Sequence, residues 1–383
     1  MVKRSLLCLI ASLVAATASG QTPDSARKLE DIRHHYETAK HYEQVTNWSA
    51  AEAEWRLVLQ IAPDDARAWT NLGVALNRQN KPAEAIDAWK RAIEIEPNLA
   101  GAYFNLGLTL VLTRAYGKAI IPLRRALEIE PDNEGARRSL AVALIGTEQF
   151  QEASRNIALL LTKFPQDSAL LEMAAQSFMR QRRYEEAASV LKRRLNLGSA
   201  PSQLWSEYGD ALDGAKRTLE AVEAYREAVR LAPDATPTRY GLGYLYWKLY
   251  RYDEAERELT EVLRRDPEDA RAAFTLGDLY LTKGDAPRAL TLLEKGAKAY
   301  PEEFDTRFAL GRALLLTGNR ARGIEELRAA VKLDDSIPDG HFELGRALMR
   351  SGRNEEAKRE LDRARELQNV KRASEAERFR KNP

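Results

Sequence analysis

The chain has 383 residues, of which 44% are hydrophobic and 30% are charged, and it contains a single cysteine. This composition is ordinary for a soluble helical protein, and one cysteine excludes an intramolecular disulfide. With 59 basic and 57 acidic residues the formal net charge is only +2, so the chain lacks the strong positive charge by which proteins attract nucleic acid or anionic membranes.

The first 20 residues have the layout of a secretory signal peptide. Lys3 and Arg4 precede an apolar run over residues 6–18, and the small-residue segment ATASG ends the stretch. A membrane anchor is the competing interpretation, but the run is well short of the roughly 20 apolar residues that span a bilayer. We therefore expect cleavage near Ala18 or Gly20 and no stable membrane insertion afterwards.

Cleavage would change both the charge and the thiol content of the chain. It would remove Lys3 and Arg4, two of the 59 basic residues, and leave 57 basic against 57 acidic residues. It would also remove Cys8, so the mature protein would have no disulfide and no thiol chemistry. The sequence thus predicts an exported protein, periplasmic or extracellular, with no nucleic-acid partner.

The stretch from Ala66 to Leu99 is the clearest unit of a repeated pattern. At about 100° per residue, Trp69, Leu72 and Leu76 share one face of a helix, and Trp89 lies on the apolar face of a second helix. The turn between the two helices is too short for anything but an antiparallel hairpin. Small residues let the two helix backbones approach closely; these are Gly73, Ala85 and Ala92.

The same spacing recurs in ten consecutive units of 34 residues without an insertion. The units begin at residues 32, 66, 100, 134, 168, 202, 236, 270, 304 and 338, and together cover residues 32–371. Residues 21–31 are expected to extend the first helix, with Thr22 as its cap and Pro23 at its first position. Residues 372–383 are mostly charged and are expected to form a short solvated cap.

Over residues 32–371 the chain resembles tetratricopeptide-repeat (TPR) proteins, whose pattern the positions of Trp69, Leu72, Gly73, Leu76 and Pro97 match. The resemblance implies an all-α fold, a solenoid in which antiparallel helix pairs wind into a right-handed superhelix. It also implies that the first helices of the pairs line a concave groove that holds partner proteins or peptides. It implies no reaction.

The residues themselves point to no catalytic or cofactor site. His34, His35 and His41 cluster in the first unit, and His34 and His41 could share one helix face. No third metal ligand is indicated beside them, and the HExxH motif is absent from the sequence. Carboxylates are abundant on periodic polar faces, where any chosen pair would be arbitrary. The arginine-rich residues 181–194 are interpreted as a solvated face. We expect no cofactor, no metal and no enzymatic activity.

A candidate binding surface follows from the first-helix positions that face away from the helix-pair contact. In the unit that begins at residue 66 these are Thr70, Val74 and Asn77, and the equivalent positions in the last four units are rich in aromatic residues. Four aromatic residues recur there at intervals of 34, with two arginines beside them. The predicted groove residues are Tyr240, Tyr244, Trp247, Phe274, Leu281, Phe308, Arg312, Phe342, Arg346 and Met349.

Two functional interpretations remain open for this row. A partly exposed aromatic stripe flanked by arginines is typical of an anchor surface for a partner protein or peptide. Stacking on sugar rings, as in TPR proteins of polysaccharide secretion, is the alternative. A structural interpretation competes with both, because each phenylalanine could simply pack against the neighbouring unit. Trp247 is the first residue to test, because unchanged partner binding and unchanged stability in Trp247→Ala would remove the main support for the groove.

Overall fold

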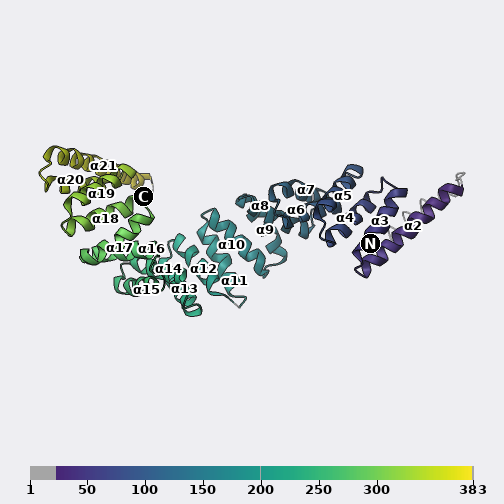
Figure 1. Ribbon diagram of the computed structural model, residues 1–383, viewed down its shortest axis with the longest axis horizontal. Coiled ribbons are helices and arrows are strands. Elements are labelled where there is room, and N and C mark those ends of the chain that lie inside the picture. Colours follow the sequence, from purple (N-terminus) through teal and green to yellow (C-terminus); the bar gives the residue numbers. More distant parts are fainter. Residues whose placement is uncertain (1–22, 199, 382–383) are drawn as a thin grey trace. The chain divides into compact units, whose positions relative to one another are not determined.

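The structure is a computed structural model that describes residues 23–198 and 200–381 (Figure 1). In these residues the chain forms 20 helices in consecutive pairs and no strand, the all-α architecture of a TPR solenoid. The chain divides after Leu197 into two compact units, which are treated separately below. The predicted signal peptide, residues 1–20, and its Cys8 lie outside the described residues, as does Thr22.

The N-terminal unit contains helices α2 to α11. The first helix, α2, runs without a break from Pro23 to Gln44, through the predicted extension and into the first repeat. The following first helices of pairs begin at residues 66, 100, 134 and 168, where the sequence repeats also begin. The helices after α2 are α3 (Trp48–Ile61), α4 (Ala66–Arg78), α5 (Pro82–Ile95), α6 (Ala100–Leu112), α7 (Tyr116–Ile129), α8 (Glu134–Gly146), α9 (Phe150–Lys163), α10 (Ser168–Arg180) and α11 (Tyr184–Leu195).

The C-terminal unit contains helices α12 to α21 and carries all of the predicted groove residues. Its last helix, α21, continues through most of the predicted charged cap. The helices are α12 (Ser202–Gly214), α13 (Thr218–Leu231), α14 (Thr236–Lys248), α15 (Tyr252–Arg265), α16 (Ala270–Thr282), α17 (Ala286–Ala299), α18 (Phe304–Leu316), α19 (Arg320–Leu333), α20 (Pro338–Met349) and α21 (Asn354–Lys381). Among the described residues, no helix combines the length and the apolar character that crossing a membrane requires.

Each helix pair closes around large side chains that meet small ones. In the pair α4 and α5, Leu72, Leu76 and Trp89 are almost completely buried. A methyl group added to Gly73 would lie 2.4 Å from Trp89 Nε1, so the indole occupies the space that a side chain would need. The indole Nε1–H donates to the Thr70 carbonyl oxygen at 3.1 Å. The pair is therefore held by apolar burial and by a hydrogen bond that satisfies its buried polar atom.

The turn inside every pair uses the same backbone conformation. One residue per turn has a positive φ, and these residues recur at intervals of 34 from Thr46 to Gly352. Glycine occupies the position in the last three turns, at Gly284, Gly318 and Gly352, whereas the earlier seven turns hold Thr46, Asn80, Arg114, Glu148, Arg182, Lys216 and Tyr250. Because L-residues adopt this left-handed region at a cost, the turn geometry is imposed by the packing of the two helices.

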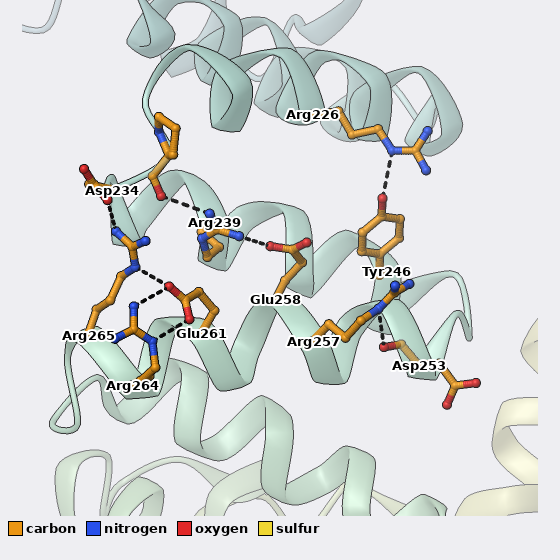
Figure 2. A network of polar contacts seen from close by, with 11 residues as sticks. Arg226, Asp234, Arg239, Tyr246, Asp253, Arg257, Glu258, Glu261, Arg264 and Arg265 are labelled. Atoms are coloured by element: carbon orange, nitrogen blue, oxygen red, sulfur yellow. Dashed lines mark hydrogen bonds and ion pairs between the residues drawn. The ribbon is translucent and has the colours of Figure 1, made fainter.

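Polar residues on the second helices tie neighbouring repeats together. Figure 2 shows Arg226 of α13 donating from Nε to the Tyr246 hydroxyl of α14 at 2.8 Å, and Arg265 of α15 paired with Asp234 in the turn before α14. Glu261 accepts hydrogen bonds from both Arg264 and Arg265 (Figure 2). These charged side chains of α15 are thus paired with partners inside the C-terminal unit.

Candidate functional site

The predicted groove residues lie on four successive first helices, α14, α16, α18 and α20. Helices α14, α16 and α18 each contact the next first helix along the chain, and α14 also contacts α12 before it. Equivalent positions on the five helices therefore form continuous rows. The groove described here is confined to the C-terminal unit.

An aromatic ladder, consisting of Tyr240, Tyr244 and Trp247, runs along α14. The rings of Tyr240 and Tyr244 are stacked with centroids 6.2 Å apart, and those of Tyr244 and Trp247 with centroids 5.6 Å apart. The spacing of four and three residues places the three side chains on one helix face, which is what allows this contact. The three side chains form one stacked aromatic surface.

The two ends of the ladder are also tied to α16. The Trp247 indole Nε1–H donates to Asp278 Oδ2 at 3.1 Å. The Arg271 guanidinium lies 4.7 Å from the Tyr240 ring centroid. Within the described residues, Tyr244 is 37% exposed and makes ring contacts only. Of the three ladder residues, Tyr244 therefore contributes least to holding the fold together.

A pocket of about 360 Å³ opens beside the ladder, between α12, α13, α14 and α16. Its lining includes the aromatic residues Tyr240 and Tyr244, the acidic residues Asp210 and Asp213, and the basic residue Arg271. The remaining lining residues are Gln203, Ser206, Tyr225, Pro237, Thr238, Gly241 and Leu245. A volume of this size suits a small ligand or a single large side chain.

Tyr225 reaches this pocket from α13, a second helix. It passes two glycines on the way: a methyl group on Gly209 or Gly241 would lie 2.5 Å or 2.3 Å from its ring. Its hydroxyl then donates to Asp210 Oδ1 at 2.5 Å. Burial, and next the negative charge of Asp210, raise the pKa of the Tyr225 hydroxyl. The neutral phenol therefore acts as a fixed donor to the carboxylate.

Asp210 and Asp213 differ in how their charges are balanced. Lys248 Nζ lies 2.7 and 2.8 Å from the two oxygens of Asp213, and Thr218 donates to Oδ1 at 2.7 Å. Asp210 is open to solvent at one side, yet the concave wall around it raises the pKa of its carboxyl by desolvation. The Tyr225 hydrogen bond lowers this pKa, while the nearby negative charge of Asp213 raises it.

Asp278, on the other side of the ladder, is a second crowded carboxylate. Desolvation by the surrounding residues raises its pKa, and the hydrogen bond from Trp247 and the positive charge of Arg312 oppose that rise. The ladder thus lies between two carboxylates whose charged forms are costly in the folded protein.

Further along the groove, packing and exposure divide the predicted row. Phe308 packs against the core formed by Ile324, Leu327 and Leu344 and stacks on Phe304 at 5.3 Å. Phe274 lies against α17, because a methyl group on Gly296 would come within 3.0 Å of its Cβ. These two phenylalanines contribute to packing between helices.

The α20 end of the row is open. Phe342 is 46% exposed and Met349 is 54% exposed. The Arg346 guanidinium lies 5.5 Å from the Phe342 ring centroid, as Arg312 lies 5.7 Å from the Phe308 centroid. This end is an apolar surface with cationic neighbours.

Leu281 does not belong to the accessible surface, and its prediction as a groove contact is wrong. Its side chain is only 5% exposed. The equivalent residue of the next repeat, Leu315, lies 3.0 Å from where a methyl group on Gly323 of α19 would be. Leu281 is thus covered by the packing between helices, whereas Met349, at the equivalent position of the last repeat, is exposed.

Sequence reasoning did not single out two residues of the pocket, Tyr225 and Arg271. The sequence marks Tyr225 by a change in side-chain size at two facing positions, residues 225 and 241. Leucine fills the equivalent position in the next four repeats, at residues 259, 293, 327 and 361, while Gly241 stands where the following repeats have Thr275 and Ala309. A larger side chain opposite a missing one indicates that the tyrosine crosses between the helices.

The histidines of the first repeat are held by ordinary contacts. His35 Nδ1 lies 2.7 Å from Glu54 Oε2, and the His34 ring packs edge-on against His35. Within residues 23–198 and 200–381, no group of three or more histidine, cysteine, aspartate or glutamate residues has a metal-binding arrangement. In the arginine-rich segment, Arg183 pairs with Glu186 and Arg194 with Glu172.

Comparison with solved structures finds partial matches. MamA 41-end from Desulfovibrio magneticus RS-1 is 23% identical, with 44% of this chain and 96% of that chain covered and a TM-score of 0.41. The Naa15/Naa10 complex bound to HypK-THB is 16% identical over 88% of this chain and 68% of that chain, with a TM-score of 0.47. YrrB, described as a TPR protein with an unusual peptide-binding site, is 20% identical over 58% and 96%, with a TM-score of 0.34.

Comparison with protein families is decisive for the fold. No curated protein matches the chain significantly. Family models described as tetratricopeptide repeat match residues 66–99 and 100–133, and a further one matches the overlapping segments 138–201, 172–236, 240–304, 274–341 and 308–370. The repeated helix pairs and these matches together show that the chain belongs to the tetratricopeptide-repeat family.

Proposed function

We propose that the protein is a non-enzymatic scaffold that holds an extended or helical segment of a partner protein against the first helices of its C-terminal unit. The observation that carries the proposal is the stacked aromatic ladder, whose central residue Tyr244 is exposed and free of polar ties within the described residues. Aromatic side chains held rigid and partly exposed are the usual anchors of protein interfaces. The TPR fold itself supports protein or peptide partners.

The ladder lies in a row that ends on a second exposed apolar surface, at Phe342 and Met349. A segment lying along the row would contact Tyr244 first and Phe342 three repeats later. Such a segment would gain affinity from two separated anchors, each of which excludes water from its partner group.

Photo-cross-linking in the native compartment tests this proposal. A photoreactive phenylalanine analogue in place of Tyr244 is expected to capture a partner protein, which mass spectrometry identifies. The same analogue in place of Leu219, an apolar residue of α13 that is 68% exposed, is the matched control and is expected to capture none. Equal capture at both positions, or none at Tyr244, would contradict binding in the groove.

A quantitative test uses Tyr244→Ala with the captured partner. We expect binding to weaken at least about tenfold, the loss of a single good anchor. The melting temperature should change little because Tyr244 is partly exposed. Trp247→Ala is the less suitable variant, since it also removes the donor to Asp278.

A polysaccharide partner is the alternative candidate, and the flat stacked faces of Tyr244 and Trp247 favour it. Sugar rings stack on such surfaces while carboxylates such as Asp210 accept their hydroxyl hydrogens. Retention of the protein on immobilised polysaccharide, abolished by Tyr244→Ala and without any captured protein, would replace the first proposal by this one.

We also propose that the protein is exported to the periplasm or the extracellular space. The layout of residues 1–20 supports the proposal. N-terminal sequencing of the protein from fractionated cells is expected to find a chain that begins after Ala18 or Gly20, outside the cytoplasm. An intact Met1 terminus in the cytoplasmic fraction would contradict it.

A further inference from the structure

We propose that the pocket beside the aromatic ladder binds a cationic side chain of the partner, an arginine or a lysine, with Asp210 as its counter-ion and Tyr244 as the ring against which it lies. This inference rests on the proposed function, because it assigns the chemistry of one residue in the bound segment. The pocket is the one bounded by α12, α13, α14 and α16.

The charges around the pocket leave one carboxylate unbalanced. Asp213 is paired with Lys248, and Arg271 is paired with Asp269 at 3.2 Å. Among the described residues, Asp210 has no cationic partner and receives only the neutral hydroxyl of Tyr225. The pocket as built therefore carries an excess of negative charge, which a single cation would neutralise.

The geometry of Asp210 suits an incoming donor. Tyr225 bonds to Oδ1 and so fixes the carboxyl group. Within the described part of the chain, Oδ2 has no hydrogen-bond donor. A guanidinium or ammonium group at Oδ2 would form a charge-assisted hydrogen bond.

The aromatic rings beside the pocket also attract a cation. Arg271 already lies with its guanidinium 4.7 Å from the Tyr240 ring centroid, which shows that this surface accepts a cation. Tyr244, the next ring of the ladder, is exposed toward the pocket and holds no cation of its own in the described residues. A partner cation between Tyr244 and Asp210 would gain both attractions.

The pocket is also matched to the size of one side chain. Its volume of about 360 Å³ is large enough for an arginine side chain and too small for a folded element. An acidic ligand is disfavoured, because the unbalanced carboxylate of Asp210 would repel it. The pocket therefore favours a cationic side chain by attraction and disfavours an anionic one by repulsion.

Selection from a displayed library of random nonapeptides, with the full mature chain as bait, gives the first test. Wild-type protein is expected to enrich peptides that contain arginine or lysine. Asp210→Asn, which keeps an acceptor for Tyr225, should lose that preference, and Asp210→Lys should enrich aspartate or glutamate instead. Asp339→Asn is the matched control, since it removes an exposed carboxylate on α20, and it should behave as wild type.

The best basic peptide is then compared with a copy in which citrulline replaces arginine, or norleucine replaces lysine. We expect the neutral copy to bind about tenfold more weakly to wild type and equally to Asp210→Asn. Enrichment of peptides without a basic residue, or an unchanged preference in Asp210→Asn that melts at the wild-type temperature, would overturn the inference.

A direct measurement separates failure of the pocket from failure of the groove. Protein labelled with 3-fluorotyrosine is titrated with Nα-acetyl-arginine amide and with its citrulline analogue, while the fluorine signals of Tyr225 and Tyr244 are followed. Shifts caused by the arginine amide alone, and absent in Asp210→Asn, support the pocket even if no peptide is enriched. Absence of such shifts, while peptides still bind at Tyr244, refutes the cation site and leaves the proposed function standing.

Discussion

The indole of Trp247 on α14 donates a hydrogen bond to the carboxylate of Asp278 on α16, with 3.1 Å between Nε1 and Oδ2. This contact makes a residue of the groove surface also a link between two repeats. Asp278 is crowded by surrounding residues, so its carboxylate depends on the few donors and charges that reach it. Replacing Trp247 therefore affects stability as well as any bound partner.

Trp247→Phe is expected to destabilise the C-terminal unit by about 1–3 kcal/mol at neutral pH, because a crowded carboxylate loses its donor. Desolvation already raises the pKa of Asp278, so the folded state takes up this proton more readily than the unfolded state. The cost of the charged form is present at neutral pH and disappears as the pH falls through the raised pKa toward 3.8.

Urea unfolding of Trp247→Phe and wild type between pH 7 and pH 4 measures this effect. The difference in unfolding free energy should shrink as the pH falls. Tyr244→Phe, which changes a neighbouring ring without touching Asp278, should give a small difference at every pH. A pH-independent difference for Trp247→Phe would mean that lost packing, not the lost donor, causes the destabilisation.

The passage of Tyr225 between α12 and α14 predicts a size coupling with Gly241. Gly241→Ala should destabilise the unit by about 1–3 kcal/mol, because its methyl group would lie 2.3 Å from the ring. Tyr225→Leu restores the residue found at the equivalent position of the next repeat, Leu259, and should make Gly241→Ala nearly neutral. A double-mutant cycle by thermal unfolding measures the coupling. Simple additivity of the two substitutions would contradict the close contact.

The turn glycine Gly284 predicts a purely conformational cost. Gly284→Ala should destabilise by roughly 1 kcal/mol, because an L-residue with φ near +82° is strained. Among the described residues, no atom from outside the local backbone lies within 4 Å of the added methyl group there, and the same is true of Gly101 in α6. Gly101→Ala, at a helical φ, should therefore be neutral or stabilising. Calorimetric melts compare the two, and equal effects would refute the explanation by φ.

Glu52 gives a prediction for the N-terminal unit at acid pH. Burial raises the pKa of Glu52, but hydrogen bonds from Lys81, Arg56 and Gln79 outweigh it and lower the pKa to about 2. A lowered pKa stabilises the fold above the unfolded value of 4.5, and this contribution is lost as the pH falls toward 2.

Glu52→Gln should thus cost about 1 kcal/mol at pH 7, since its cationic partners are half exposed, and should cost little near pH 2. Chemical unfolding across this range, followed by circular dichroism, is the measurement. Glu84→Gln serves as the control, because Glu84 also pairs with Arg56 but is more exposed than Glu52. An equal loss for both variants would argue against the cluster at Glu52.

The fold could be predicted from the sequence because each position of the 34-residue unit occurs in ten copies. The side-chain size that the position requires is therefore indicated repeatedly. The first helices α4, α6, α8, α10, α12, α14, α16, α18 and α20 begin at the residues where the sequence units begin. Large residues such as Trp89 and small ones such as Gly73 recur in a fixed order, and only one pairing of two helices satisfies that order.

The candidate site was only partly predictable, because helix periodicity gives the direction of a side chain but not its length. Tyr244 is exposed on the predicted face, whereas Leu281 has the same periodicity and is covered. Tyr225 lies on a second helix, α13, and its hydroxyl reaches Asp210 on the neighbouring first helix. Such contacts depend on which neighbour is a glycine, and that requires the packed helices.

The turns between paired helices also carry a consequence for the length of the protein. Tyr250 and Gly284 have the same left-handed backbone conformation one repeat apart, so the chain could be cut at one and rejoined at the other without a new turn geometry. Excision of residues 251–284 would remove one unit of 34 residues, with α15 and α16, and α14 would then be followed by α17. The reach of the groove is thus set by the number of repeats, and a partner segment could be matched by adding or removing whole units while every turn is preserved.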